Sequence, residues 1–254
     1  MKFEKHLPSP LLTHYIKYYV VSENDAANEY KVLPNTGLVM GFQYKGKLSV
    51  ITGNTENQLA TAGITGIADS YKVFKNTAGV GTVLVYFTET GFAHFATAPA
   101  NELFNLSVPL HDIFDKDKLA EVEDRLAAAL SDMQRIKLVE RFLLLHLKNI
   151  QTDKLITEAV KLIYQSNGSI RIKALHEKLF ISQSPFEKRF RKVVGTSPKK
   201  FADIIRLNHV LGQLGKSKSL GEICYENNFF DQAHFSKHFK QFTGDTPENF
   251  KRLL

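Results

Sequence analysis

The sequence predicts an α+β protein with a β-rich N-terminal region and an all-helical C-terminal region. Segments such as KVLPNTGLVMGFQYKGKLSVITG and GVGTVLVYFTETG mix β-branched and aromatic residues with Gly, Pro and Asn breakers. From about Asp115 the apolar residues change to helical spacing, and the C-terminal region contains an internal helical repeat. The 254 residues, 43% of them hydrophobic, suffice for two domains with full cores and exclude intrinsic disorder.

The first region, residues 1–150, is expected to be a small antiparallel β-barrel or sandwich with trailing helices. Its short segments are bounded by turn residues, which is typical of such folds. The trailing segment DKLAEVEDRLAAALSDM places Leu119, Val122, Leu126 and Leu130 at helical spacing. The next segment, RIKLVERFLLLHLKNI, is apolar on more than one side, so we expect it to be either buried or paired in a homodimer.

The excess positive charge lies entirely in the C-terminal region. Residues 155–254 contain 17 Lys and Arg against 9 Asp and Glu, whereas residues 1–154 contain 16 against 17. A basic module beside a near-neutral one is typical of polyanion binding, although a merely soluble basic domain would show the same charge.

Several other classes of protein are not expected. Cys224 is the single cysteine, which excludes an intramolecular disulfide and a multi-cysteine zinc site. No apolar run approaches the roughly 20 residues of a membrane span, and the first residues lack the pattern of a secretory signal, so we expect a cytoplasmic protein without membrane contact. The sequence has no paired histidine motif, P-loop or dinucleotide-binding pattern. We therefore expect no enzymatic activity, no cofactor and no metal.

The C-terminal region, residues 155–254, contains two copies of one pattern. Six residues recur at a spacing of 49, namely Phe186, Lys188, Phe190, Gly195, Pro198 and Phe201, matched by Phe235, Lys237, Phe239, Gly244, Pro247 and Phe250. Upstream the spacing is 48, with Ile172, Leu175 and His176 matched by Leu220, Ile223 and Cys224. The agreement indicates a duplication in which the second copy has one extra residue in its turn.

Each copy is expected to form a helix-turn-helix unit. A short helix leads through a tight turn into a second helix, on which two phenylalanines four residues apart face a core and leave a polar, basic face outward. Gly195 and Gly244 stand where such helices end in a left-handed residue. The Ser-Pro and Thr-Pro pairs at 197–198 and 246–247 then begin the following helices, with the hydroxyl as cap.

These patterns carry a family resemblance. The run SLGEICYENNFFDQAHFSKHFKQFTGDTPENF resembles the second helix-turn-helix of AraC/XylS-type transcription regulators, and IRIKALHEKLFISQSPFEKRFRKVVGTSPKKF is similar to the first. KVLPNTG and VLVYFTETGFAHF resemble, more weakly, the cupin-like sensory region of that family. The resemblance implies a sequence-specific regulator that binds double-stranded DNA and whose N-terminal region binds a small-molecule effector or forms a homodimer. An activator of this kind would also contact RNA polymerase.

By this resemblance, the second helix of each unit enters a major groove, and a helix over residues 199–215 joins the units. At about 1.5 Å per residue that helix spans roughly 25 Å. With the widths of the units added, this length suits two reading helices about 34 Å apart, which is one turn of DNA.

The first unit departs from the family where Phe180 replaces the common glycine, and the second has Asn228 at the corresponding place. Asn tolerates a left-handed conformation, whereas Phe does so poorly, so a left-handed requirement would change the shape of the first turn. His176 and Cys224 stand where the family usually has Ala.

Base contacts are expected from the first turns of the reading helices, that is from Ser184, Glu187 and Lys188 in the first unit and from Gln232, Ala233, His234, Ser236 and Lys237 in the second. Glu accepts from cytosine, Lys donates to guanine, Gln reads adenine and Ala packs on a thymine methyl group. Ser184 and Glu187 also fit a capping box, which would occupy both side chains with the backbone unless Ser182 is the cap. In the second unit Asp231 is the expected cap, and His234 is either a DNA donor or a rim residue.

Phosphate contacts position a protein on DNA without specifying its sequence. We expect them from Gln183, Arg191, Lys192, Lys199, Lys200 and Lys240, although a solvated surface role is an equal alternative for each one singly.

Two other functions are compatible with the sequence. One is a non-specific or architectural DNA-binding protein without an effector, for which the β-rich first region has no obvious use. The remote one is an alkyl-accepting repair regulator that uses Cys224, although this residue occupies a small inward position where Cys behaves as a hydrophobe. The aromatic residues of the first region line an effector pocket or simply form its core.

Overall fold

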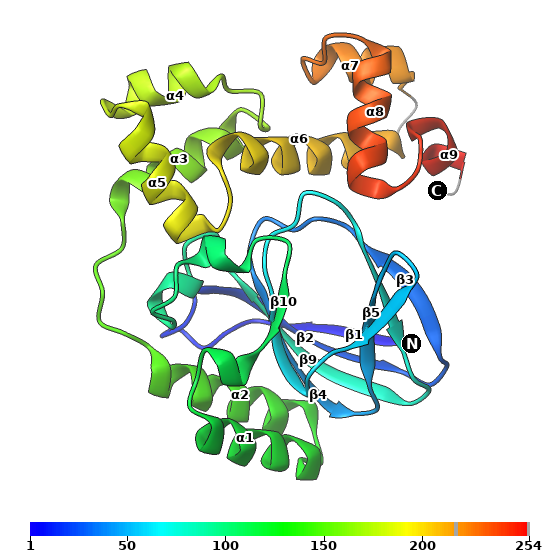
Figure 1. Ribbon diagram of the computed structural model, residues 1–254, viewed down its shortest axis with the longest axis vertical. Coiled ribbons are helices and arrows are strands. Elements are labelled where there is room, and N and C mark those ends of the chain that lie inside the picture. Colours follow the sequence, from blue (N-terminus) through cyan, green and yellow to red (C-terminus); the bar gives the residue numbers. More distant parts are fainter. Residues whose placement is uncertain (216–217, 253–254) are drawn as a thin grey trace.

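The computed structural model describes residues 1–215 and 218–252, and it has two parts (Figure 1). A β-rich N-terminal part carries two helices on its far side, and seven helices form the C-terminal part above it in this view. This is the α+β class that the sequence predicts. The division into domains 1–150 and 155–254 stays a prediction, and residues 216–217 and 253–254 of the second lie outside the described residues.

All strand pairs are antiparallel and form two sheets. The larger has the order β1-β2-β9-β4-β7-β10; its strands are β1 Lys2–His6, β2 Ile16–Asn24, β9 Val80–Phe87, β4 Val39–Lys45, β7 Ala62–Thr65 and β10 Ser107–Pro109. The smaller has the order β3-β8-β5-β6; its strands are β3 Asn28–Val32, β8 Lys72–Asn76, β5 Leu48–Thr52 and β6 Thr55–Gln58. No strand pairing joins the sheets in the described part of the chain, so the expected barrel or sandwich is an open pair of sheets.

Two trailing helices, α1 (Lys116–Ala128) and α2 (Asp132–His146), pack on the larger sheet (Figure 1). Phe142 of α2 meets Phe42 of β4 edge to face, with 5.9 Å between ring centroids. The buried residues of α2 are Ile136, Val139, Phe142 and Leu143. Internal packing therefore accounts for most of the apolar surface of α2, and the homodimer stays a prediction.

The expected helical face that ends at Leu130 is one turn too long. Helix α1 ends at Ala128, Ala129 is extended, and the side chain of Leu130 is 91% exposed. The Leu130 N–H donates to Gln134 Oε1 at 2.9 Å, and Ser131 caps α2 by accepting from the Gln134 N–H. The cap of the second helix thus prevails over the apolar spacing of the first.

The C-terminal part consists of α3 Lys154–Gln165, α4 Ile172–Leu179, α5 Gln183–Val194, α6 Pro198–Leu214, α7 Leu220–Glu226, α8 Gln232–Thr243 and α9 Pro247–Arg252. Helices α4 and α5 form one helix-turn-helix unit, α7 and α8 form the other, and α6 joins them (Figure 1). Gly195 and Gly244 end α5 and α8 with φ of 99° and 80°. The hydroxyls of Ser197 and Thr246 accept from the N–H groups three residues on. The predicted ends and caps of these helices are confirmed.

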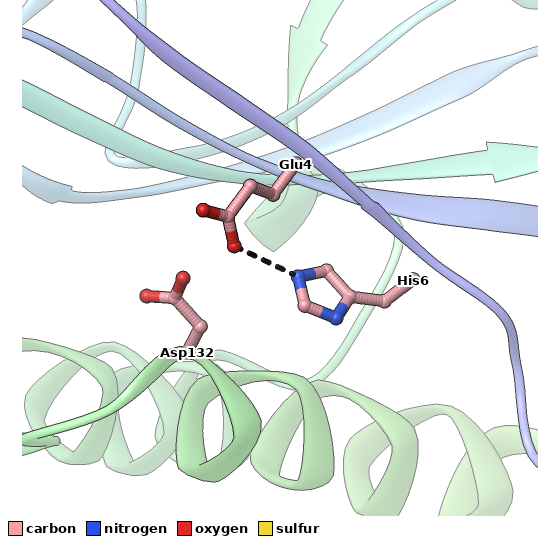
Figure 2. A group of neighbouring side chains, drawn as sticks. All are labelled: Glu4, His6 and Asp132. Atoms are coloured by element: carbon pink, nitrogen blue, oxygen red, sulfur yellow. Dashed lines mark ion pairs between the residues drawn. The ribbon is translucent and has the colours of Figure 1, made fainter.

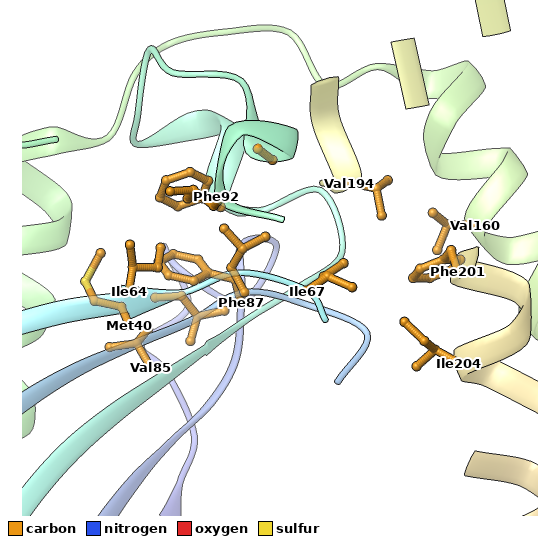
Figure 3. Close-up of a cluster of buried hydrophobic side chains, with 14 of the residues drawn as sticks. Met40, Ile64, Ile67, Val85, Phe87, Phe92, Val160, Val194, Phe201 and Ile204 are labelled. Atoms are coloured by element: carbon orange, nitrogen blue, oxygen red, sulfur yellow. The ribbon is translucent and has the colours of Figure 1, made fainter. Parts of the chain in front are cut away.

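One continuous cluster of buried apolar side chains runs from the larger sheet into the C-terminal helices. Figure 3 shows Phe87 on the sheet side and Phe201 on the helical side, with Ile67 and Val194 where the two sides meet. All four side chains are nearly inaccessible to solvent. The hydrophobic effect therefore holds α5 and α6 against the β-rich part.

Phe180, in the turn between α4 and α5, adopts the left-handed conformation with φ 50° and ψ 41°, and Asn228 does the same with φ 55°. Both turns therefore contain the left-handed residue at this place, and the expectation that Phe180 would change the first turn here is wrong. The side chain of Phe180 is 97% exposed. It meets nothing that would push the backbone away, and the residue bears a conformational cost of roughly 1–2 kcal/mol.

Replacing Phe180 with Asn should stabilise the protein. The change F180N loses no buried apolar surface, because the Phe180 side chain is exposed. Asn tolerates the left-handed conformation better than Phe, so the free energy of unfolding should rise by about 1 kcal/mol. Chemical denaturation at equilibrium measures this. The matched control is F230N, because Phe230 is also almost fully exposed but has no positive φ. Equal effects of the two changes would contradict the strain at Phe180.

Candidate nucleic-acid interface

The reading helices α5 and α8 are fixed by pairs of buried phenylalanines. Phe186 and Phe190 of α5, and Phe235 and Phe239 of α8, are at most 1% exposed. Phe190 packs on Phe201 of α6 with 5.6 Å between ring centroids, and the second unit repeats this contact between Phe239 and Phe250 at 5.5 Å. Because the aromatic face is buried, the opposite face of each helix is presented outward.

The start of each reading helix decides which side chains are left for DNA. Helix α5 begins at Gln183 after Ser182, so Ser184 is its second residue and the capping box is not formed. Glu187 instead accepts from Gln183 Nε2 at 2.9 Å and lies 3.7 Å from an Arg191 nitrogen. Asp231 caps α8, as predicted, by accepting from the His234 N–H at 2.6 Å.

The residues expected to contact bases gather on the outward first turns. Ser184, Lys188, Gln232, Ala233, His234 and Lys237 are exposed, whereas Glu187 and Ser236 are half-buried. The ring of His234 lies 6.0 Å from that of Phe229 and 5.9 Å from that of His238. His234 is thus an exposed rim residue whose ring nitrogens can still reach a nucleic acid. The base contacts themselves stay predictions.

The residues expected to contact phosphates divide into two groups. Gln183, Arg191, Lys192 and Lys240 are exposed on the reading helices. Lys199 and Lys200, at the start of α6, are both engaged elsewhere. Lys199 lies 3.0 Å from Asp203, and Lys200 forms an ion pair with Asp69 of the N-terminal part while its ammonium lies 4.7 Å from the centre of the Phe104 ring. Lys200 can reach a phosphate only if this ion pair opens.

Comparison with known families agrees with this geometry. Residues 175–253 match a family model described as a helix-turn-helix domain. The C-terminal segment therefore belongs to a family of helix-turn-helix domains. Residues 4–109 match a second family, a domain of unknown function (DUF6597). No curated protein sequence matches the chain.

Solved structures with a similar chain course have little sequence identity to this protein. ToxT from Vibrio cholerae is 10% identical, with 100% of this chain and 99% of that chain covered and a TM-score of 0.48. The C-terminal domain of AraT, a response regulator from Geobacillus stearothermophilus, is 19% identical, with 41% of this chain and 89% of that chain covered and a TM-score of 0.39.

In the helix-turn-helix domain, α6 is tied to the second unit by a buried ionic network. Asp203 of α6 accepts from Arg206 Nη2 at 2.8 Å and lies 3.8 Å from His238 of α8. The Arg206 guanidinium also lies 4.4 Å from the centre of the Phe229 ring, in the turn before α8. Burial raises the pKa of Asp203, but His238 and Lys199 outweigh it, so this pKa lies below its ordinary value of 3.8.

The far ends of both reading helices rest on the N-terminal part. A Cβ at Gly244, which ends α8, would lie 2.7 Å from the Tyr71 ring, and one at Gly195, which ends α5, would lie 3.2 Å from the Ala100 carbonyl oxygen. Next to Gly244, Asp245 accepts from Lys31 Nζ at 2.8 Å. The N-terminal ends of the reading helices are left open, and their C-terminal ends are held.

The first unit has an anchor that no sequence signal indicated. Arg189 of α5 donates from two guanidinium nitrogens to the carboxylate of Asp153, at 2.9 and 3.1 Å. Asp153 also caps α3. A bidentate pair of this kind fixes the orientation of α5 on α3, and the two residues are too far apart in sequence for any periodicity to pair them.

Cys224 is 5% exposed, and its burial, together with the nearby Asp231, raises the pKa of its thiol. Both features disfavour the thiolate that an alkyl acceptor needs. The structure therefore offers no support for the repair alternative.

None of the helices in the described ranges is long and apolar enough to span a bilayer.

One group of side chains resembles a metal site. Glu4, His6 and Asp132 bring their ligand atoms within 4.8 Å of one another between β1 and α2 (Figure 2). However, Lys2 Nζ lies 2.5 Å from Asp132, and an Arg135 nitrogen lies 3.3 Å from it. These cations already neutralise the carboxylate, so we interpret the group as an ionic tie between the edge strand and α2.

Removing the charge of Asp203 should loosen the second unit. The change D203N leaves the buried Arg206 without its counter-charge, so the free energy of unfolding at pH 7 should fall by roughly 2–3 kcal/mol. Because the pKa of Asp203 is lowered in the folded protein, the stabilisation that its charge gives to the fold is complete above pH 3.8 and is lost as the pH falls below that value. The difference from the parent protein, measured by denaturant unfolding, should shrink in that range.

The control for this prediction is K199M, which removes only the more exposed partner of Asp203. It should change the free energy of unfolding by less than about 0.5 kcal/mol. A loss in K199M as large as that in D203N, or a D203N difference that does not change below pH 3.8, would contradict the proposed role of the buried pair.

Proposed function

We propose that this protein is a sequence-specific, double-stranded-DNA-binding transcription regulator whose N-terminal part controls how the reading helices are presented. The observation that carries the proposal is the pair of helix-turn-helix units whose aromatic faces are buried and whose first turns are open to solvent. Base edges in a major groove are contacted by the N-terminal residues of such helices.

The geometry of α6 supports binding of both units to one face of a duplex. The helix has 17 residues, which corresponds to roughly 25 Å at about 1.5 Å per residue. Near its start, Phe201 packs on Phe190 of α5. Near its end, Gln213 accepts from Asn227 Nδ2 at 2.6 Å, directly after α7 of the second unit. A rigid connection of this length favours two successive major grooves, whose centres lie about 34 Å apart.

The chemistry of the exposed first turns supports sequence recognition over simple coating. The first unit presents Ser184 and Lys188, whereas the second presents Gln232, Ala233 and His234. A carboxamide can pair with adenine through two hydrogen bonds and a methyl group can pack on a thymine methyl group, so each matches a particular base edge. A non-specific protein would need only the cations.

Control by the N-terminal part is supported by the ionic contacts between the two parts. Asp69 binds Lys200, and its carbonyl oxygen accepts from Gln241 Nε2 of α8 at 3.4 Å. Burial raises the pKa of Asp69, but hydrogen bonds from Lys200 and Asn105 outweigh it and keep this pKa low, so Asp69 is ionised at neutral pH. An effector or a second copy that shifts the N-terminal part would alter these contacts and thereby DNA affinity. Contact with RNA polymerase would follow if the regulator is an activator.

Binding of selected DNA tests the proposed function. The full chain is used to select sites from random duplexes, and fluorescence anisotropy then measures Kd for selected and random duplexes at several salt concentrations. We expect a selected site to bind at least about a thousandfold more tightly than random DNA, with a steep dependence on salt. Salt-sensitive binding without any sequence preference would instead favour the architectural alternative.

Releasing Lys200 tests the control by the N-terminal part. The change D69N removes the carboxylate that competes with phosphate for Lys200. The affinity for the selected duplex should therefore rise several-fold, and the slope of log K against log salt should steepen by about 0.9, the value of one added phosphate contact.

The matched control for D69N is E56Q. It also removes one negative charge, and the ion pair that it breaks, between Lys75 and Glu56 at 2.6 Å, lies on the smaller sheet. An equal gain in E56Q would assign the effect to net charge, and unchanged binding by D69N would show that Asp69 does not restrain Lys200.

A further inference from the structure

The turns of the two helix-turn-helix units differ by one residue, and the structure identifies it as Phe230. In the first unit the left-handed Phe180 is followed by Ile181 and by Ser182, which precedes α5. In the second unit the left-handed Asn228 is followed by Phe229, Phe230 and the cap Asp231. Ile181 and Phe229 both pack against the core, and Ser182 and Asp231 both occupy the cap position. Phe230 is the one residue left without a counterpart.

The fold makes no use of the Phe230 side chain. It is 93% exposed. An apolar residue directly before a helix cap commonly packs on the fourth residue of the helix, which here is Phe235. That place is taken by Phe229, whose ring centroid lies 4.9 Å from that of Phe235 and which the Arg206 guanidinium also contacts. The Phe230 side chain therefore stays in contact with water, and its apolar surface contributes nothing to the stability of the fold.

The position of Phe230 points to what covers it. It directly precedes Asp231, Gln232 and Ala233, which form the exposed start of α8, and this end of the helix is the one left open by the N-terminal part. The apolar group that a base pair displays in the major groove is the thymine methyl group. We propose that Phe230 is a specificity-determining residue that packs against a thymine methyl group at the edge of the site read by α8. This inference rests on the proposed DNA-binding function.

Thymine-to-uracil exchange in the DNA tests the contact. With the duplex selected by the full chain, each thymine is replaced in turn by deoxyuridine, which removes only the methyl group, and Kd is measured for the parent protein and for F230A. Burial of one methyl group corresponds to about fourfold in affinity. At one thymine position the exchange should raise the Kd of the parent protein by about this factor or more and leave the Kd of F230A unchanged. The slope of log K against log salt should be the same for both proteins.

Tyr225 provides the matched control. It is 86% exposed on α7 of the same unit, next to Glu226 and one turn from Glu222, whose carboxylates would repel phosphates. The change Y225A should leave Kd and the thymine dependence unaltered. Thermal unfolding of F230A should match that of the parent, because no buried contact is lost.

The outcomes separate this inference from the function on which it rests. If no duplex is selected, the proposed function and this inference both fail. If a site is selected but F230A binds it as the parent does, or loses affinity equally with thymine and with uracil at every position, the function stands and the contact between Phe230 and a thymine methyl group is refuted.

Discussion

Burial of two phenylalanine pairs at positions i and i+4 is the constraint on which the DNA-binding part depends. Phe186 and Phe190 fix α5, and Phe235 and Phe239 fix α8. Each pair is continued by the phenylalanine after the next proline, so both helices are oriented by the same contact in both units. Since an α-helix can bury only one stripe, this burial also decides which residues face outward.

The same core extends into the β-rich part, and this has a consequence for regulation. Apolar side chains hold the two parts together, whereas the ion pairs at the contact lie at its accessible edge. The apolar contacts supply most of the affinity between the parts, because exposed ion pairs contribute little. The pairs have a different value: Lys200 is a cation that both Asp69 and a phosphate can bind. A contact of this kind links the position of the N-terminal part to the charge offered to DNA.

Departures from the sequence expectations arise where two local rules compete. The apolar spacing through Leu130 predicts a longer α1, but the cap at Ser131 ends it first. Ser184 and Glu187 match a capping box, yet α5 begins at Gln183 after Ser182, two residues before the start that a Ser184 cap would give. Phe180 occupies a left-handed position that suits glycine, and packing of the flanking helices overrides this preference. In each case a short-range pattern was correct in kind, and the neighbouring elements decided its boundary.

Local sequence patterns were sufficient to predict the duplication, the two helix-turn-helix units, the caps at Asp231, Ser197 and Thr246, and the glycines that end the reading helices. These features depend on periodicity and on residues within one turn of each other, so the order of residues along the chain is enough to predict them. The folded chain was needed to show that the two sheets stay open, that Arg189 binds Asp153, that Asp69 holds Lys200, and that Phe229 rather than Phe230 packs inward. These features join residues far apart in sequence or distinguish adjacent identical ones, and only the packed chain brings the competing partners together.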